Sequence, residues 1–318
     1  MGIGVGVQIL PTRLFRRPTK APLTKRRLLF KMESQAPPLS PRIFQPWALK
    51  NLPPFRPVAV RLVKLTAQDD VSIAKVQQVL RTDVAFSAEV LRLANSAMAG
   101  SRNEVRSVAH AVAMVGLERL KALSMTIALR DFLSSSKSNK SMELCWRYNL
   151  ATAVICEWLA PIVHLDPDSC YTAGLIHDIG RLAILRAFPD EYFHMLSVIE
   201  DYGFDLLQCE QDLFDINHCQ AGRWLMERWD FPADLKDVAE LHHQTPTDGT
   251  AELVTVVYIA WQIADMLGFS PLAVRSHANI EEITATLPET ARQAIFAKLD
   301  HLTDLVMLKL KAGEPVPA

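Results

Sequence analysis

The sequence lacks any apolar run long enough to cross a bilayer, and it lacks a framework of paired cysteines. The longest apolar stretch, residues 253–264, is shorter than the roughly 20 residues that a membrane-spanning helix needs, and it runs into Asp265. The apolar start at residues 2–10 has no basic residue before it and no cleavage site after it, unlike a secretory signal. The five cysteines show no CxxC pair, which is typical of free thiols in a reducing compartment. We therefore expect a soluble, cytoplasmic protein without a membrane partner.

Strand patterns and common nucleotide-binding motifs are also missing. No segment shows sustained alternation of apolar and polar residues between hairpin turns, and the chain contains neither a P-loop nor a GxSxG motif. The formal net charge is only −1, which gives the whole chain no bias toward nucleic acid or membrane. These absences exclude a β-rich fold and the commonest phosphate-cradling and serine-hydrolase sites.

The first 50 residues differ in composition from the rest of the chain. Residues 1–31 carry eight basic side chains and no acid, so the remainder has a formal net charge of −9. Ten of the 19 prolines fall within the first 57 residues, which favours a disordered tail over residues 1–50. Two interpretations stay open: the tail is a basic arm that associates with nucleic acid through residues 1–31, or Met32 is the true start.

From Val58 onward the apolar spacing is helical. Phe86, Val90, Ala94 and similar sets follow the i, i+4, i+8 pattern of an amphipathic helix. The polar run 134–141 interrupts this pattern and reads as a linker. The sequence thus predicts an all-α fold with an N-terminal helical lobe at 51–133, a second lobe at 142–270, and a C-terminal extension at 271–318 with one or two helices.

The second lobe contains a group of ionisable residues on faces that should be buried: His177, Asp178, His218, His242, His243 and Asp265. A buried carboxylate costs several kcal/mol unless it is paired or bound to a cation. Taken singly, each histidine is most simply a core residue bonded to a carbonyl. Their order on successive helices favours a metal site instead, since imidazole and carboxylate together suit Fe, Mn or Zn.

Sequence motifs in both lobes identify a resemblance. Residues 81–97 end in Leu-Arg-Leu-Ala-Asn-Ser-Ala, and 107–120 carry an Ala-Val-x-x-Val-Gly pattern. Residues 173–182 read Ala-Gly-Leu-Ile-His-Asp-Ile-Gly-Arg-Leu, and His218-x-x-Ala-Gly is followed by Trp229-x-Phe-Pro and the His242-His243 pair. Over about residues 50–270 the chain resembles the HDOD (HD-related output domain) family of bacterial signalling proteins. That family is related to the HD superfamily of helical, metal-dependent phosphohydrolases.

The departures from the HD pattern bear on function. HD enzymes have a further histidine on the helix before His-Asp, and this chain has Tyr148 at the matching position, which implies a degenerate metal site. No Gly-Tyr-Pro follows the paired histidines, which argues against the cyclic-di-GMP phosphodiesterase branch. Arg181 stands where HD enzymes often carry lysine, and it could contact phosphate or pair with Asp265. The resemblance implies no cofactor beyond at most one divalent ion.

Two functions from different classes follow. The added lobe and the incomplete ligand set favour a non-catalytic signalling module that binds a protein partner or a small effector. The alternative is a metal-dependent phosphohydrolase acting on a nucleotide or phosphoester, since the six candidate ligands are all present.

Overall fold

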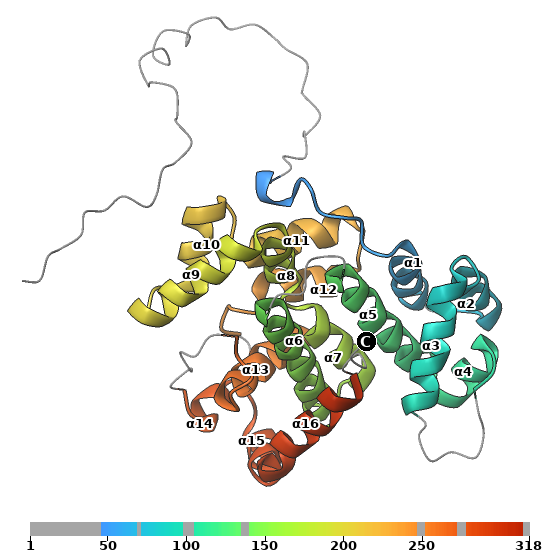
Figure 1. Cartoon of the computed structure of the whole chain (residues 1–318). Coiled ribbons are helices and arrows are strands. Elements are labelled where there is room, and N and C mark those ends of the chain that lie inside the picture. The colour runs from blue at the N-terminus through green and yellow to red at the C-terminus, as the bar shows by residue number, and fades with distance from the viewer. Residues whose placement is uncertain are drawn as a thin grey trace, which may run out of the picture. The chain divides into compact units, whose positions relative to one another are not determined.

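The computed structural model describes residues 46–68, 71–97, 105–134, 140–246, 252–271 and 278–313, apart from the side chains of 96–97, 134, 140–141 and 312–313. Within these ranges the chain is helical and no residue lies in a strand (Figure 1). The predicted all-α class is therefore confirmed. The basic, proline-rich tail and most of the predicted linker fall outside the described residues.

The described residues of the predicted N-terminal lobe form one 3-10 turn and five α-helices. These elements are η2 (Trp47–Leu49), α1 (Pro57–Thr66), α2 (Ile73–Leu80), α3 (Val84–Ala97), α4 (Val108–Val115) and α5 (Leu117–Ser134). Ser72 and Ser107 cap α2 and α4 by accepting a hydrogen bond from the amide three residues on. The apolar face predicted for α3 is confirmed, because Phe86, Val90 and Ala94 are all buried in the core.

The second lobe is built around α6, which packs against both α7 and α13. Its elements are α6 (Lys140–Leu159), η3 (Ala160–Ile162), α7 (Pro167–Ile176), α8 (Ile179–Ala187), α9 (Pro189–Tyr202), α10 (Leu206–Phe214), α11 (His218–Arg228), α12 (Ala233–Leu241) and α13 (Leu253–Met266). Asp166, Asp205 and Asn217 accept hydrogen bonds at the starts of α7, α10 and α11 and so fix where these helices begin.

The C-terminal segment contains more helices than the sequence pattern indicated. It forms α14 (Ile280–Ile283), α15 (Glu289–Phe296), η4 (Leu299–His301) and α16 (Leu302–Gly313), where one or two helices were expected. An Asn279 capping box starts α14, and Pro288 immediately precedes α15. These local signals mark where α14 and α15 begin. Helix α16 returns to pack against α6, and residues Gln45–Ala318 form one compact unit.

Two glycines allow the helices of the second lobe to approach closely. A Cβ on Gly174 of α7 would lie 2.9 Å from the Ala153 Cα of α6, and a Cβ on Gly180 of α8 would lie 1.9 Å from the His218 carbonyl oxygen of α11. At Gly174 the absence of a side chain lets α6 and α7 approach closely. These contacts help to position His177, which follows α7, and His218, which begins α11.

Among the described residues, the helices are either too short or too polar to pass through a bilayer.

Candidate metal centre

His177 and Asp178 occupy the junction between two short helices. His177 directly follows the last residue of α7, and Asp178 directly precedes α8. Both side chains are 1% exposed. The Gly174 carbonyl lies 2.7 Å from His177 Nδ1 and accepts its hydrogen bond when that nitrogen is protonated. The junction therefore aims an imidazole and a carboxylate into the interior of the lobe.

His218 is held at the start of α11 by a carboxylate that the sequence analysis did not single out. Glu210, fully buried on α10, lies 2.7 Å from His218 Nδ1 and also accepts a hydrogen bond from the His218 amide at 2.7 Å. Tyr192 on α9 donates a short hydrogen bond to the other oxygen of Glu210. A carboxylate bound to one ring nitrogen is the usual way a metal-ligating histidine is oriented.

His242 and His243 lie where α12 ends. Val238 O lies 3.2 Å from His242 Nδ1, and the Trp261 indole donates to the His242 carbonyl at 2.7 Å. The His243 ring packs beside Trp261, with ring centroids 4.8 Å apart. The His242 ring faces those of His177 and His218 at centroid distances of 5.1 and 5.4 Å. Three helix ends and Asp178 thus converge, as the order of residues predicted.

Several buried polar atoms in this cluster have no hydrogen-bond partner within the described structure. They are Nε2 of His218, Nε2 of His242, both carboxylate oxygens of Asp178 and Oδ1 of Asp265. Buried polar atoms are nearly always satisfied in native proteins, so such a convergence calls for a ligand. All five atoms carry lone pairs when the imidazole nitrogens are deprotonated. The residues present therefore fit a divalent cation.

Arg181 contributes a cation to the same cluster. Its guanidinium, 4% exposed, lies 2.8 Å from Asp178 Oδ2, without the alignment of a hydrogen bond. Burial opposes its charge, but the nearby Asp178 outweighs this, and the pKa of Arg181 is raised well above its ordinary value. The sequence offers two roles for Arg181, a contact with phosphate or an ion pair with Asp265. The structure places the ion pair on Asp178 instead, because the two residues are three apart at the start of α8.

Tyr148, which the resemblance matches to a histidine of HD enzymes, lies inside the cluster. It is 3% exposed, and its ring centroid is 5.9 Å from that of His177 and 5.8 Å from the Arg181 guanidinium carbon. Burial and the charge of Asp265 raise the pKa of Tyr148 well above its usual value, so the phenol is neutral. Burial also raises the pKa of Asp265, against the lowering effects of Ser270, Arg181 and Tyr148.

The histidines differ in their protonation. Burial lowers the pKa of His177 to about 4, and burial together with neighbouring imidazoles lowers those of His242 and His243 well below the usual value. Burial opposes protonation of His218 too, but Glu210, Cys219 and Asp178 reverse the balance and raise its pKa to about 10. Three imidazoles are thus neutral near pH 7 and the fourth carries a proton that a metal ion would displace.

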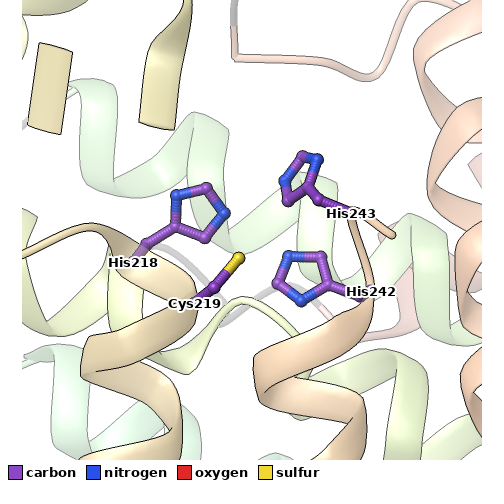
Figure 2. A group of neighbouring side chains, drawn as sticks. All are labelled: His218, Cys219, His242 and His243. Carbon is purple, nitrogen blue, oxygen red and sulfur yellow. The ribbon is translucent and has the colours of Figure 1, made fainter. Parts of the chain in front are cut away.

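Sequence reasoning missed Cys219, which follows His218 on α11. One ligand atom from each of His218, Cys219, His242 and His243 lies within 4.8 Å of the others (Figure 2). The only sequence signal was its place beside a candidate ligand. The sequence analysis had treated all five cysteines as free thiols, and all five are free.

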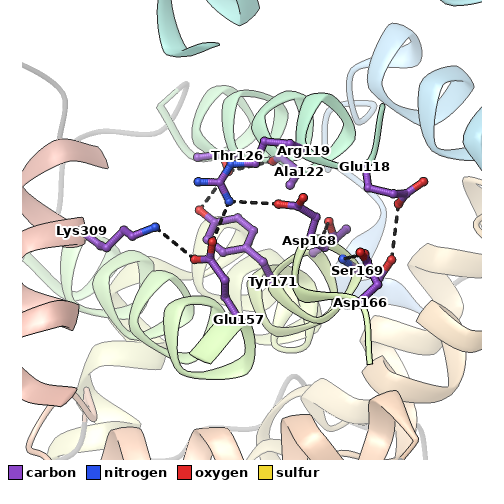
Figure 3. A network of polar contacts seen from close by, with 11 residues as sticks. Glu118, Arg119, Ala122, Thr126, Glu157, Asp166, Asp168, Ser169, Tyr171 and Lys309 are labelled. Carbon is purple, nitrogen blue, oxygen red and sulfur yellow. Dashed lines mark hydrogen bonds and ion pairs between the residues drawn. The ribbon is translucent and has the colours of Figure 1, made fainter. Parts of the chain in front are cut away.

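A second polar cluster joins the two lobes and the C-terminal helix (Figure 3). Arg119 of α5 donates to Glu157 of α6 at 2.9 Å and to Asp168 of α7 at 3.0 Å. Lys309 of α16 donates to the other oxygen of Glu157 at 3.3 Å. These bonds tie the N-terminal lobe, the second lobe and the extension together at one place.

A cavity of about 370 Å³ opens beside this junction. Its walls come from both lobes and mix apolar side chains with one basic, one acidic and two hydroxyl residues. They are Val63, Ala67, Lys121, Ser169, Thr172, Pro232, Asp234, Leu235 and Leu253. The volume lies within the range of small-molecule pockets.

The fold and the cluster define a helical protein with an HD-like arrangement of histidine and aspartate at the ends of packed helices. The model of the HDOD domain matches residues 52–245, more than half of the chain. The chain belongs to the HDOD family.

Solved structures share this fold. An HDOD domain protein of unknown function from Geobacter sulfurreducens has a TM-score of 0.68 and 24% identity, over 83% of this chain and 94% of that one. A protein from Marinobacter aquaeolei VT8 whose name proposes a signal transduction role has a TM-score of 0.64 and 22% identity, over 82% of this chain and 60% of that one. A protein from Shewanella amazonensis SB2B whose name proposes a phosphohydrolase has a TM-score of 0.62 and 23% identity, over 83% of this chain and 95% of that one.

Curated relatives match only in part. An uncharacterized protein of Treponema pallidum (strain Nichols) is 22% identical over 201 residues, which are 62% of this chain and 39% of that protein. Ribonuclease Y of Mycoplasma genitalium is 26% identical over 176 residues, which are 52% of this chain and 28% of the enzyme. The chain thus spans well under half the length of either relative.

Proposed function

We propose that this protein is a non-catalytic regulatory module that transmits a signal by binding a protein partner or a small effector. One observation carries the proposal: a neutral phenol and a guanidinium occupy the His/Asp cluster. Tyr148 replaces an imidazole donor, and Arg181 neutralises Asp178, the carboxylate that would bridge two ions in an HD enzyme. The cluster can then hold at most one divalent ion, Fe, Mn or Zn.

The burial of the cluster supports the same proposal. His177, Asp178, Arg181, His218 and His242 are each at most 4% exposed. A hydrolase must bring its substrate into contact with the ions and the attacking water. Side chains buried to this degree offer a phosphoester no contact surface unless helices move apart.

The cavity between the lobes is the place we propose for a small effector. Leu235 and Thr172 in its wall belong to α12 and α7, the helices that His242 and His177 directly follow. Val63 and Lys121, which also line the cavity, belong to α1 and α5. A ligand that contacts both walls would bias the relative position of the two lobes, which is what a signalling module requires.

A metal-dependent phosphohydrolase is the second candidate function. It is favoured by the unpartnered Nε2 atoms of His218 and His242 and the unpartnered oxygens of Asp178. When bound, divalent ions would polarise a phosphoester and generate a nucleophile from water. Glu210 would keep the His218 ring in place, and Arg181 would have to leave Asp178 to contact phosphate.

The decisive experiment compares wild type with Tyr148→His for bound metal and for phosphoesterase activity on nucleotides and cyclic dinucleotides. We expect the wild type to hold at most one ion and to show no metal-dependent turnover. Tyr148→His should hold more metal, because it adds an imidazole donor and vacates the space beyond it. Tyr148→Phe is the matched control, since it removes the hydroxyl without adding a donor. Two ions and turnover in the wild type would establish the hydrolase instead.

The proposed location is the cytoplasm, because the free cysteines suit a reducing compartment.

The proposal also includes an association of residues 1–31 with nucleic acid, which would be steeply salt-dependent and indifferent to sequence. A truncated protein that starts at Met32 and keeps full affinity for DNA and RNA would exclude this role of residues 1–31.

A further inference from the structure

The four residues in Figure 2 form a donor set that differs from the carboxylate-centred site considered above. His218 and Cys219 are consecutive in the first turn of α11, and His242 and His243 are consecutive where α12 ends. Figure 2 shows the Cys219 sulfur pointing into the space between the His218 and His242 rings, with His243 completing the ring of side chains. One nitrogen or sulfur atom of each residue lies within 4.8 Å of the others.

Two of these histidines are already oriented as metal ligands. His218 Nδ1 contacts Glu210 and His242 Nδ1 contacts the Val238 carbonyl, so each ring presents Nε2 to the interior. Both Nε2 atoms are buried and without a hydrogen-bond partner in the part of the chain described. A ring held at one nitrogen and free at the other is the arrangement found in metal-ligating histidines.

The competing oxygen donor is already neutralised. Asp178 lies 3.6 Å from His218 Nε2, but Arg181 approaches its Oδ2 to 2.8 Å. A cation bound by the imidazoles and the thiolate does not depend on Asp178, whereas a cation placed against that carboxylate would be repelled by the guanidinium.

We propose that His218, Cys219, His242 and His243 bind a single thiophilic divalent ion, by preference Zn²⁺, in a closed four-ligand site. Imidazole nitrogen and thiolate sulfur are the ligands of four-coordinate structural zinc sites, and a thiolate selects zinc over manganese or magnesium. Four protein ligands leave no open position for a reactive water. The ion joins the start of α11 to the end of α12 and stabilises that corner of the lobe. The inference rests on the proposed function in one respect, namely that no second ion binds at Asp178.

The test uses full-length protein loaded with Zn²⁺ or with Co²⁺ as a spectroscopic substitute. We expect about one ion per chain and, with Co²⁺, the near-ultraviolet charge-transfer absorption that a cobalt–thiolate bond gives. Cys219→Ser should lose this absorption and bind Zn²⁺ more than about tenfold more weakly. Cys209→Ser, which alters a half-buried cysteine on α10, is the matched control and should keep both. Circular dichroism checks that each variant remains helical.

The variant Asp265→Asn distinguishes a carboxylate-centred metal site from the His/Cys site. A carboxylate-centred site would lose metal in this variant, and the His/Cys site should keep its ion and its cobalt–thiolate absorption. Cobalt bound without that absorption, or full Zn²⁺ affinity in Cys219→Ser, would overturn the inference. If Cys219→Ser fails to fold, the wild-type cobalt spectrum decides. Phosphoesterase activity is a separate readout, so turnover with an intact cobalt–thiolate signal would refute the proposed function and leave the inference standing.

Discussion

Glu210 holds His218 at two points, through the ring Nδ1 and through the backbone amide, each at 2.7 Å. The carboxylate is fully buried, and its pKa is lowered because the charge and hydrogen bonds of His218 outweigh the opposing effect of burial. His218 in turn has its pKa raised to about 10, against burial, chiefly by Glu210. The pair therefore fixes both the start of α11 and the direction of the ring.

Glu210→Gln should destabilise the metal-free protein by about 3 kcal/mol, since it leaves a buried imidazolium short of its main counter-charge. Urea unfolding in the presence of chelator measures this. Tyr192→Phe is the matched control: it removes one hydrogen bond to Glu210 and keeps the carboxylate, so about 1 kcal/mol is expected. Equal losses in the two variants would show that the carboxylate charge is unimportant.

Gly180→Ala should prevent the close contact between α8 and α11. The added Cβ would meet backbone atoms, the His218 oxygen at 1.9 Å and the Gly222 nitrogen at 2.5 Å, and backbone cannot rotate away. We expect a loss of about 3 kcal/mol or more, or no soluble product. The Cβ added by Gly222→Ala meets no atom closer than the Ala239 Cβ, at 3.2 Å, and should cost about 1 kcal/mol. Thermal unfolding of both variants makes the comparison.

Arg119→Ala should loosen the junction of the two lobes. Its guanidinium bonds both Glu157 and Asp168, and removing it leaves two half-buried carboxylates facing each other. A loss of about 1–3 kcal/mol is expected. Lys309→Ala breaks a single, more exposed ion pair with Glu157 and should cost less than about 1 kcal/mol. Chemical denaturation followed at two wavelengths would also show whether the lobes still unfold together.

Glu89 makes part of the stability depend on acid pH. It accepts hydrogen bonds from Arg92 and Arg130, which outweigh burial and lower its pKa from 4.5 to about 2. Because the folded-state pKa is the lower one, its contribution is complete above pH 4.5 and is lost as the pH falls toward 2.

Glu89→Gln should therefore have a lower melting temperature than wild type at pH 7, and the two should converge as the pH falls toward 2. Melting temperatures measured at intervals from pH 7 to pH 2 test this. A constant difference across the whole range would mean that Glu89 ionisation is not linked to folding.

The features that were predictable from sequence are those set by short-range patterns. The spacing of Phe86, Val90 and Ala94 gives the buried face of α3 because a helix repeats every 3.6 residues. The order of His177, His218 and His242 on successive helices indicated that they could meet, and the structure brings their rings within contact.

What could not be predicted depends on how helices pack across the chain. Glu210 reaches His218 only because α10 turns back onto the start of α11, and no local spacing marks that turn. Cys219 faces the cluster although consecutive residues on a helix point about 100° apart. The Arg181–Asp178 ion pair has an i, i+3 spacing that is visible in the sequence, but spacing alone does not decide between Asp178 and Asp265 as the partner of Arg181.

Arg181 gives the last prediction, because it takes the electrostatic place of a metal ion beside Asp178. Arg181→Gln should destabilise the chelator-treated protein by about 3–5 kcal/mol, since it leaves a buried carboxylate uncompensated. Divalent metal should restore part of that loss, because an ion bound at Asp178 stabilises the folded state by mass action. Arg223→Gln, which removes a surface arginine from three acidic neighbours, is the control and should cost less than about 1 kcal/mol with or without metal. The free energy of unfolding in urea is measured for both variants and the wild type, first with chelator and then with excess Zn²⁺ or Mn²⁺. If metal stabilised Arg181→Gln no more than wild type, the guanidinium would be a structural residue without the role of a built-in cation.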